Sequence, residues 1–187
     1  MGPLGLAAFA RIPLHPTGMV IFAHGSGSGR LSTRNNQVAE ALYEAGLASL
    51  LLDLLTPAEE SDRRYVFDVA LLGGRLLAAH EWLSGEATTA DLPVGYFGAS
   101  TGGGAALVAA AEAGPYVKAV VSRGGRPDLA GPVLADVTAP TLLIVGSNDG
   151  PVVDLNRKAL GQITAEKKLT SSRAPATCSK SLAPSTR

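Results

Sequence analysis

The stretch Val94-Gly95-Tyr96-Phe97-Gly98-Ala99-Ser100-Thr101-Gly102 decides the fold class of this 187-residue chain. A strand-like apolar run ends in a Gly-x-Ser-x-Gly pentapeptide, and a helical run of small residues follows to about Glu112. A sharp strand-to-helix turn, the nucleophile elbow, strains its central residue and raises that side chain above the sheet. We therefore expect Ser100 to be an exposed nucleophile. The alternative is a glycine-rich turn whose serine merely caps the helix.

Apolar strands alternate with helical patterns on both sides of this turn. This alternation predicts an α/β fold with three layers, in which a mostly parallel sheet lies between helices. An antiparallel strand or hairpin is expected within residues 4–14, and residues 56–64 are expected to be a polar loop. Only 18 residues separate Val121 from Pro140, which leaves no room for a large lid. The expected strands are 19–23, 47–52, 94–97, 117–121 and 141–145, and the expected helices are about 32–44, 68–83, 101–112 and 154–160.

The glycine-rich loop His24-Gly25-Ser26-Gly27 follows the first clear strand. In this architecture such a loop donates one amide to the oxyanion, and the residue after the nucleophile donates the other. We therefore expect the N–H groups of Ser26 and Thr101 to form an oxyanion hole. A phosphate-binding glycine loop and a plain flexible turn are the alternatives. Neither phosphate-loop signature, G-x-x-x-x-G-K-[ST] nor G-x-G-x-x-G, is present in register.

Asp149 ends the last clear strand and is the candidate acid of a catalytic triad, because it follows Ser100 in the chain. A turn aspartate before Gly150-Pro151 is the alternative reading of this residue, and Asp154 is the second candidate acid. We expect His24 to be a structural hydrogen-bonding residue and not a base. The chain has three histidines, and all of them precede Ser100: His15, His24 and His80. The position after Asp149, where the third member of the triad belongs, therefore has none.

The composition indicates one globular domain, with 46% hydrophobic residues, 17% charged residues and a formal net charge of zero. No basic stripe is present, so we expect no nucleic-acid partner. The single cysteine, Cys178, excludes a disulfide framework and a cysteine-rich metal site, which favours a reducing, cytoplasmic location. The apolar run 18–23 is too short to span a bilayer, and the N-terminus lacks the basic segment of a signal peptide. We therefore expect no membrane partner.

From about Val20 to Leu169, the chain resembles the dienelactone hydrolase family of α/β-hydrolases. The resemblance implies hydrolysis of a small-molecule ester or lactone, with no metal and no organic cofactor. The best-known members of the family use a cysteine nucleophile, so Ser100 implies a serine-type esterase here. A non-catalytic binding domain of this fold and an acyltransferase are the alternatives. The segments that carry the resemblance are 24–27, 46–53, 95–102, 122–128 and 139–146.

One of these segments points to a smaller group of proteins within the family. Ser122-Arg123-Gly124-Gly125-Arg126-Pro127-Asp128 is typical of a bacterial subgroup whose members sometimes follow a phosphoribosyltransferase domain. Relatives of this subgroup are expected to continue past Leu169 with a strand and then a Pro-Gly-Ala-x-His motif that carries the catalytic histidine.

The end of the chain is expected to differ from the rest. Residues 1–170 are expected to form the α/β-hydrolase domain, and residues 171–187, rich in Ser, Thr, Pro, Lys and Arg, a disordered tail. A GC-rich coding sequence for the histidine motif, read with its first base dropped, encodes the chain from Ser171 to Arg187. We therefore interpret the tail as a frameshift that removes the last strand, a packing helix and the histidine. On this interpretation Cys178 has no catalytic role and the activity is impaired.

Overall fold

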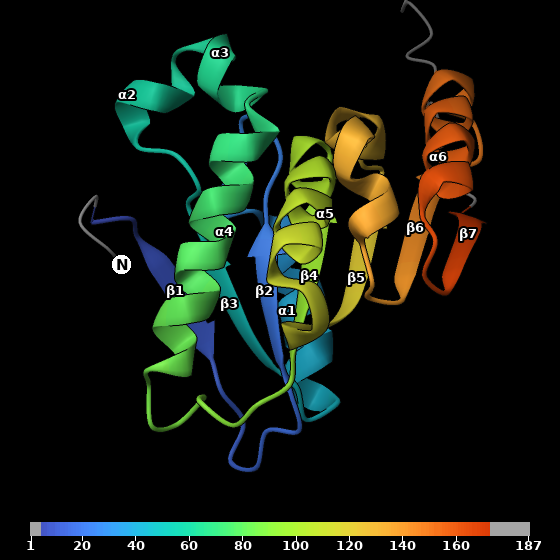
Figure 1. The fold of residues 1–187 in the computed structure, drawn as a ribbon. Helices are drawn as coiled ribbons and strands as arrows, with labels where there is room; N and C mark the ends of the chain where they lie inside the picture. The colour runs from blue at the N-terminus through green and yellow to red at the C-terminus, as the bar shows by residue number, and fades with distance from the viewer. Residues whose placement is uncertain (1–4, 173–187) are drawn as a thin grey trace, which may run out of the picture.

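The computed structural model describes residues 5–172 of the chain. Its centre is a seven-stranded sheet with strand order β1-β3-β2-β4-β5-β6-β7 (Figure 1). β1 pairs antiparallel with β3, and every other neighbouring pair is parallel. The predicted α/β class and the antiparallel first strand are thus confirmed. The strands are β1 Ala8–Arg11, β2 Met19–Ala23, β3 Ala48–Leu52, β4 Val94–Ala99, β5 Val117–Arg123, β6 Thr141–Gly146 and β7 Lys167–Ser172.

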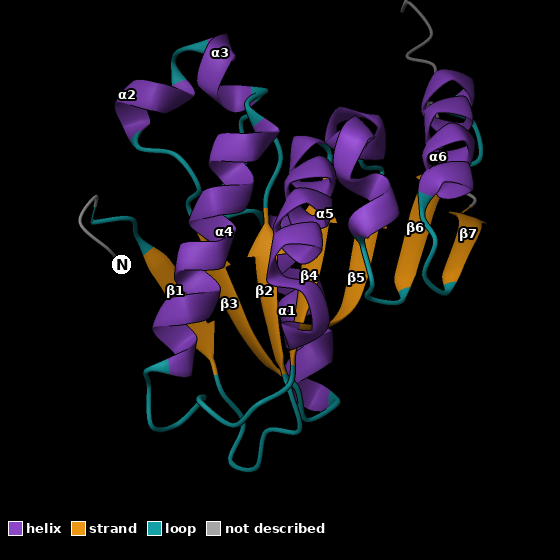
Figure 2. Cartoon of the chain, in the orientation of Figure 1, coloured by secondary structure: helices purple, strands orange, loops and turns teal. Residues whose placement is uncertain are grey.

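Helices cover both faces of this sheet (Figure 2), as the three-layer prediction requires. Polar caps begin two of them: the Ser32 side chain accepts a hydrogen bond from the amide of Asn35, and that of Asp68 from the amide of Leu71. The α-helices are α1 Thr33–Glu44, α2 Pro57–Glu60, α3 Arg63–Val66, α4 Val69–Ser84, α5 Thr101–Ala113 and α6 Gly150–Gln162, and the 3₁₀ segments are η1 Gly114–Tyr116 and η2 Pro127–Asp136.

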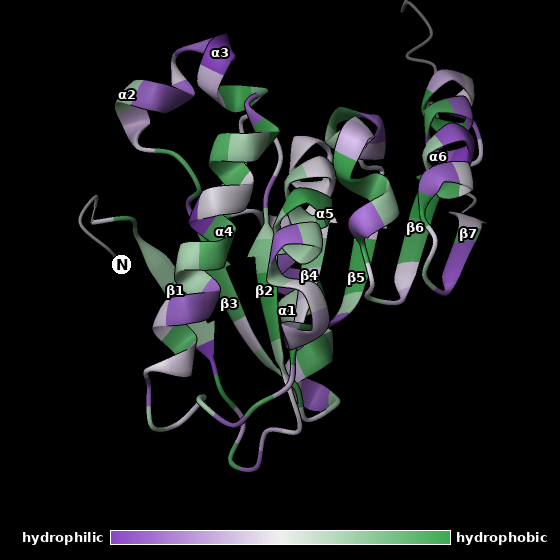
Figure 3. Cartoon of the chain, in the orientation of Figure 1, coloured by the Kyte–Doolittle hydropathy of each residue, from purple (hydrophilic) through white to green (hydrophobic). Residues whose placement is uncertain are grey.

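Two apolar clusters hold these layers together. Side chains that alternate along β2 and β4 point to opposite faces of the sheet. Phe22 and Phe97 lie in the smaller cluster, which includes Ala39 of α1. Ile21 and Tyr96 lie in the larger cluster, which includes buried residues of α4, α5 and α6. The sheet is therefore buried on both faces, which explains why its central strands are nearly all apolar (Figure 3).

Two predictions about the secondary structure are wrong. The expected polar loop at 56–64 contains the short helices α2 and α3. Thr56 caps α2 in a capping box with Glu59, and Pro57 occupies the first turn, which are signals that the sequence already held. The chain also forms the last strand that was expected to be missing, because β7 pairs with β6 from Lys167 to Ser172.

The described sheet thus extends two residues beyond the predicted domain boundary at residue 170. β7 is hydrophilic and lies at the edge of the sheet (Figure 3), and its Ser171 and Ser172 are exposed. The rest of the predicted tail, with Cys178, lies outside the described residues.

Candidate active site

The turn between β4 and α5 has the geometry that the pentapeptide predicts. Ser100 has φ 53° and ψ −126°, and it is the single non-glycine residue with a positive φ between residues 5 and 172. Its side chain is exposed to solvent. Its carbonyl oxygen accepts two hydrogen bonds, from the amide of Gly103 at 3.0 Å and from the amide of Arg126 at 2.9 Å. Since a positive φ is costly for a residue with a β-carbon, these contacts hold Ser100 in a strained conformation.

The two glycines of the pentapeptide are required by close backbone contacts. A β-carbon built on Gly98 would lie 2.6 Å from the Cα of Gly103, and one built on Gly102 would lie 2.6 Å from the carbonyl oxygen of His24. Neither backbone segment can move away, because Gly103 belongs to α5 and His24 directly follows β2 in the centre of the sheet. The pentapeptide is therefore a packing requirement of the turn that presents Ser100.

The loop after β2 contacts Ser100 directly. A β-carbon built on Gly25 would lie 2.6 Å from the β-carbon of Ser100 and 3.3 Å from its Oγ. The loop then turns back, since the amide of Ser28 donates to the carbonyl of Gly25 at 3.2 Å and Gly27 has φ +65°. The nucleophile candidate and the glycine-rich loop, which are far apart in sequence, therefore lie side by side.

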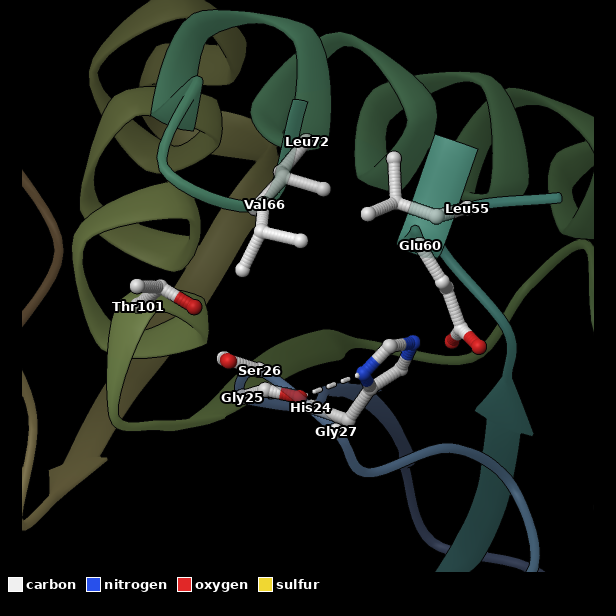
Figure 4. Close-up of a pocket in the computed structure, with 9 residues that line it drawn as sticks. All are labelled: His24, Gly25, Ser26, Gly27, Leu55, Glu60, Val66, Leu72 and Thr101. Atoms are coloured by element: carbon white, nitrogen blue, oxygen red, sulfur yellow. Dashed lines mark hydrogen bonds between the residues drawn. The ribbon is translucent and has the colours of Figure 1, made fainter. Parts of the chain in front are cut away.

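The two amides predicted for the oxyanion hole, those of Ser26 and Thr101, have no hydrogen-bond acceptor in the described part of the chain. Both residues line one small pocket behind the loop, with Val66 and Leu72 on its apolar side (Figure 4). Thr101 also begins α5, where the helix dipole gives partial positive charge.

His24 fixes the shape of this loop and is not positioned to act as a base. Its Nε2 accepts a hydrogen bond from the amide of Leu54 at 2.8 Å, so the proton resides on Nδ1. That nitrogen lies 2.9 Å from the carbonyl oxygen of Gly25 and donates to it (Figure 4). Both ring nitrogens are therefore engaged in holding the loop against the end of β3. An ion pair between Arg30 and Asp53 ties the same loop to the same strand end.

An open cavity of about 690 Å³ lies in front of Ser100. It is formed at the carboxyl ends of the parallel strands, where α/β proteins bind their ligands. Its walls come from the loop after β2, the first turn of α1 and the ends of β5, β6 and β7. The lining residues are Gly25, Ser26, Ser28, Ser32, Arg34, Asn35, Ala99, Ser100, Arg123, Gly124, Gly146 and Ser172.

The two arginines of this cavity are functional candidates that the sequence did not single out. Arg123 donates through Nη2 to Oδ1 of the buried Asn35 at 3.1 Å, and its guanidinium lies 5.7 Å from the ring centroid of Phe97. Burial, and then the nearby charge of Arg34, lower the pKa of Arg123. Arg123 occurs in the segment 122–128 that carries the subgroup resemblance, but it lies 88 positions from Asn35, and no sequence pattern joins the two.

Asp149 lies at the same edge of the sheet but outside the cavity wall. It follows β6 and precedes α6, its side chain is exposed, and its amide donates to the carbonyl of Gly146 at 3.2 Å. Gly146 lines the cavity, so Asp149 is three residues from its wall. The second candidate acid, Asp154, forms an exposed ion pair with Arg157 on α6 at 3.2 Å.

The other histidines lie outside the cavity that contains Ser100. His80 of α4 is half-buried, and its Nδ1 lies 2.7 Å from the hydroxyl of Tyr96. Burial lowers the pKa of His80 and raises the pKa of Tyr96. His15 is exposed in the segment between β1 and β2. The site described here thus has a serine, two free amides and two arginines, but no imidazole beside the serine.

Two further observations bear on the kind of site. Within residues 5–172, no group of three or more His, Cys, Asp or Glu side chains is arranged to hold a metal ion. In the same part of the chain, no helix combines the length and the apolar character needed to cross a membrane.

Comparison with known proteins places this geometry in a family. Dienelactone hydrolase from Anabaena variabilis is 55% identical to this chain and superposes with a TM-score of 0.88, covering 92% of this chain and 82% of that protein. Est1E from Butyrivibrio proteoclasticus shares the fold at 17% identity, with a TM-score of 0.74 over 90% of this chain and 84% of its own. No family model matches the sequence.

Curated relatives from Mycobacterium tuberculosis have a different name. They are 57% identical over 169 residues and are provisionally named phosphoribosyl transferases. The alignment covers 90% of this chain, which spans 38% of the length of these relatives. The high identity to the Anabaena enzyme, which this chain covers over most of its length, together with the strained serine turn, shows that this chain belongs to the dienelactone hydrolase family of α/β-hydrolases.

Proposed function

We propose that this chain is a serine hydrolase of small carboxylic esters or lactones that works through an acyl-enzyme on Ser100. The observation that carries the proposal is the strained, exposed Ser100 in contact with the loop whose Ser26 amide has no protein acceptor. Strained backbone of this kind persists where function requires it. A serine that merely capped α5 would accept a hydrogen bond from the first turn of the helix, and the Ser100 side chain makes no such bond.

The chemistry follows from these positions. The Oγ of Ser100 attacks the carbonyl carbon of the ester, its proton passes to a base, and the tetrahedral oxyanion accepts hydrogen bonds from the amides of Ser26 and Thr101. Collapse expels the alcohol, which takes up a proton, and leaves an acyl group on Ser100. Water then hydrolyses this acyl group. Removing one oxyanion donor from such a site costs about 10²–10³ in rate.

The mechanism also needs a base that accepts the proton of Ser100. Asp149 is proposed to orient a histidine, but none follows it in this sequence, and His24 is fully engaged in the loop. Loss of a triad histidine costs on the order of 10⁶ in kcat, while the oxyanion hole and binding retain about 10³–10⁴ over the uncatalysed reaction. We therefore expect a polypeptide of these residues to hydrolyse small aryl esters slowly, at a rate that depends on Ser100.

The transferase name of the mycobacterial relatives fits this proposal if it describes another part of them. The matched region amounts to 38% of their length and, in this chain, has the fold of a dienelactone hydrolase. We propose that phosphoribosyl transfer belongs to the remainder of those proteins.

The proposal is tested by labelling with a fluorophosphonate, which reacts with activated serines, in the absence and presence of added imidazole. We expect a single adduct on Ser100, formed faster with imidazole and absent from the Ser100→Ala variant. Ser84→Ala is a matched control, because Ser84 is an exposed serine at the end of α4. A protein that stays unlabelled under both conditions would instead be a non-catalytic binding domain.

A further inference from the structure

The cavity in front of Ser100 has an unbalanced positive charge. Arg34 and Arg123 line it, and no carboxylate among the described residues 5–172 does. Six arginines elsewhere in residues 5–172 each form an ion pair with an aspartate or glutamate: Arg11, Arg30, Arg64, Arg75, Arg126 and Arg157. In that part of the chain three arginines have no acidic partner, and two of the three are in this cavity.

Arg123 is held in position for a ligand. Its hydrogen bond to Oδ1 of Asn35 and its place against the ring of Phe97 use part of its donor set, and Asn35 itself is only 2% exposed. A guanidinium has five N–H donors, so most remain free to face the cavity. A planar guanidinium restrained in this way loses little conformational freedom when it binds an anionic group of a ligand. Arg34, in contrast, is exposed in the first turn of α1 and can move toward the ligand.

Neutral donors surround the same space. Ser28 and Ser32 both line the cavity. The Oγ of Ser32 accepts from the amide of Asn35 at 3.4 Å, so its hydroxyl proton remains available to donate. The first turn of α1 contains no acidic residue, so the positive end of its dipole adds to the two full charges.

We propose that the substrate of this site has a phosphate group that is not itself the reacting centre, and that Arg34 and Arg123 bind it while Ser100 attacks the ester or lactone of the same molecule. The inference rests on the proposed function of Ser100. Two guanidiniums with no carboxylate between them are neutralised by a dianion, whereas a monoanion leaves one charge uncompensated. The three terminal oxygens of a phosphate also accept enough hydrogen bonds to use both arginines and the serine hydroxyls.

The test uses inorganic phosphate as the probe and isothermal titration calorimetry as the readout, at low ionic strength. We expect saturable binding to the wild-type chain and to Ser100→Ala. Arg34→Gln and Arg123→Gln should each weaken binding by about tenfold or more, since each removes charge-assisted hydrogen bonds. Arg63→Gln is the matched control, because Arg63 is the third arginine without an acidic partner and lies away from the cavity on α3. Arg123→Lys keeps the positive charge but removes the planar guanidinium, so it separates the loss of guanidinium hydrogen bonds from misfolding. The melting temperature of every variant shows whether it is folded.

Several results would overturn the inference. It fails if phosphate does not bind, if Arg63→Gln weakens binding as much as the cavity variants, or if both cavity variants bind normally. If acetate binds as tightly as phosphate at equal ionic strength, the inference of a phosphate group is wrong, and the anionic group of the substrate would be a carboxylate. A second readout connects the anion to the serine: phosphate should slow fluorophosphonate labelling of Ser100 in the wild type but not in Arg123→Gln. Calorimetry does not need a reactive serine, so failure of the proposed function and failure of this inference give different results.

Discussion

The substitution Gly25→Ala probes the contact on which the site depends. The new methyl group would lie 2.6 Å from the β-carbon of Ser100 and 3.0 Å from the carbonyl oxygen of Ala99. Carbon atoms pack best at about 3.5–4.0 Å, so one side has to move by about 1 Å. Ser100 cannot easily move, because its carbonyl accepts hydrogen bonds from the amides of Gly103 and Arg126. We therefore expect the loop, with the amide of Ser26, to shift away from the serine.

Two magnitudes follow from that displacement. Inserting one methyl group into a packed site typically costs about 1–3 kcal/mol. For a chain of this size that lowers the melting temperature by roughly 2–12 °C. A misplacement of about 1 Å in a catalytic arrangement can cost on the order of 10² in rate. We expect the imidazole-assisted labelling of Ser100 by a fluorophosphonate to slow by about that factor.

The assay compares three proteins under identical conditions, with labelling followed by intact-mass spectrometry and unfolding by circular dichroism. Gly74→Ala is the control, since Gly74 is exposed on α4 and a β-carbon there meets nothing within 4 Å. Alanine at a helical glycine should leave labelling unchanged and stabilise the protein by about 0.5–1 kcal/mol. Wild-type labelling together with a wild-type melting temperature in Gly25→Ala would refute the proximity of the loop and the serine.

Two further substitutions test supports of the site. His24→Ala removes the acceptor for the Leu54 amide and the donor to the Gly25 carbonyl. We therefore expect the free energy of unfolding, measured with urea, to fall by about 1–3 kcal/mol. An unchanged value would show that the ring is dispensable. Glu59→Gln should cost about 1 kcal/mol at pH 7, because hydrogen bonds from Arg75 hold the pKa of Glu59 at about 2 instead of 4.5. That stability is present above pH 4.5 and is lost as the pH falls toward 2, so urea titrations of the two proteins should converge there; a difference that persists at low pH would contradict the assignment.

The central sheet and the serine turn could be predicted because local and global signals agree in them. Apolar runs between glycine turns define β2 to β6, and Gly98 and Gly102 occupy positions that only glycine can fill. The short helix α2 was missed although its capping box was visible, because a polar segment of four residues shows no apolar period. β7 was missed for a related reason: Leu169 is its one apolar residue, and its strand character comes from pairing with β6.

Part of the candidate site could be predicted from the sequence for the same reason. Ser100, Ser26 and Thr101 follow from two loops whose geometry is set locally by glycines. Arg34 and Arg123 do not, since their approach depends on how α1 packs against the sheet and on where β5 ends. Arginines are also frequent on surfaces. What sets these two apart is that they line one cavity beside Ser100 without an acidic partner among the described residues, which is a property of the folded chain.

The role of Ser100 as the nucleophile is tested most directly by capturing an acyl-enzyme. The chain is mixed with p-nitrophenyl acetate and imidazole, quenched in acid, and mapped by peptide mass spectrometry. We expect one acetyl group on Ser100, absent from Ser100→Ala and much reduced in Gly25→Ala. Acetylation spread over lysines, with Ser100 unmodified while the protein remains folded, would contradict it.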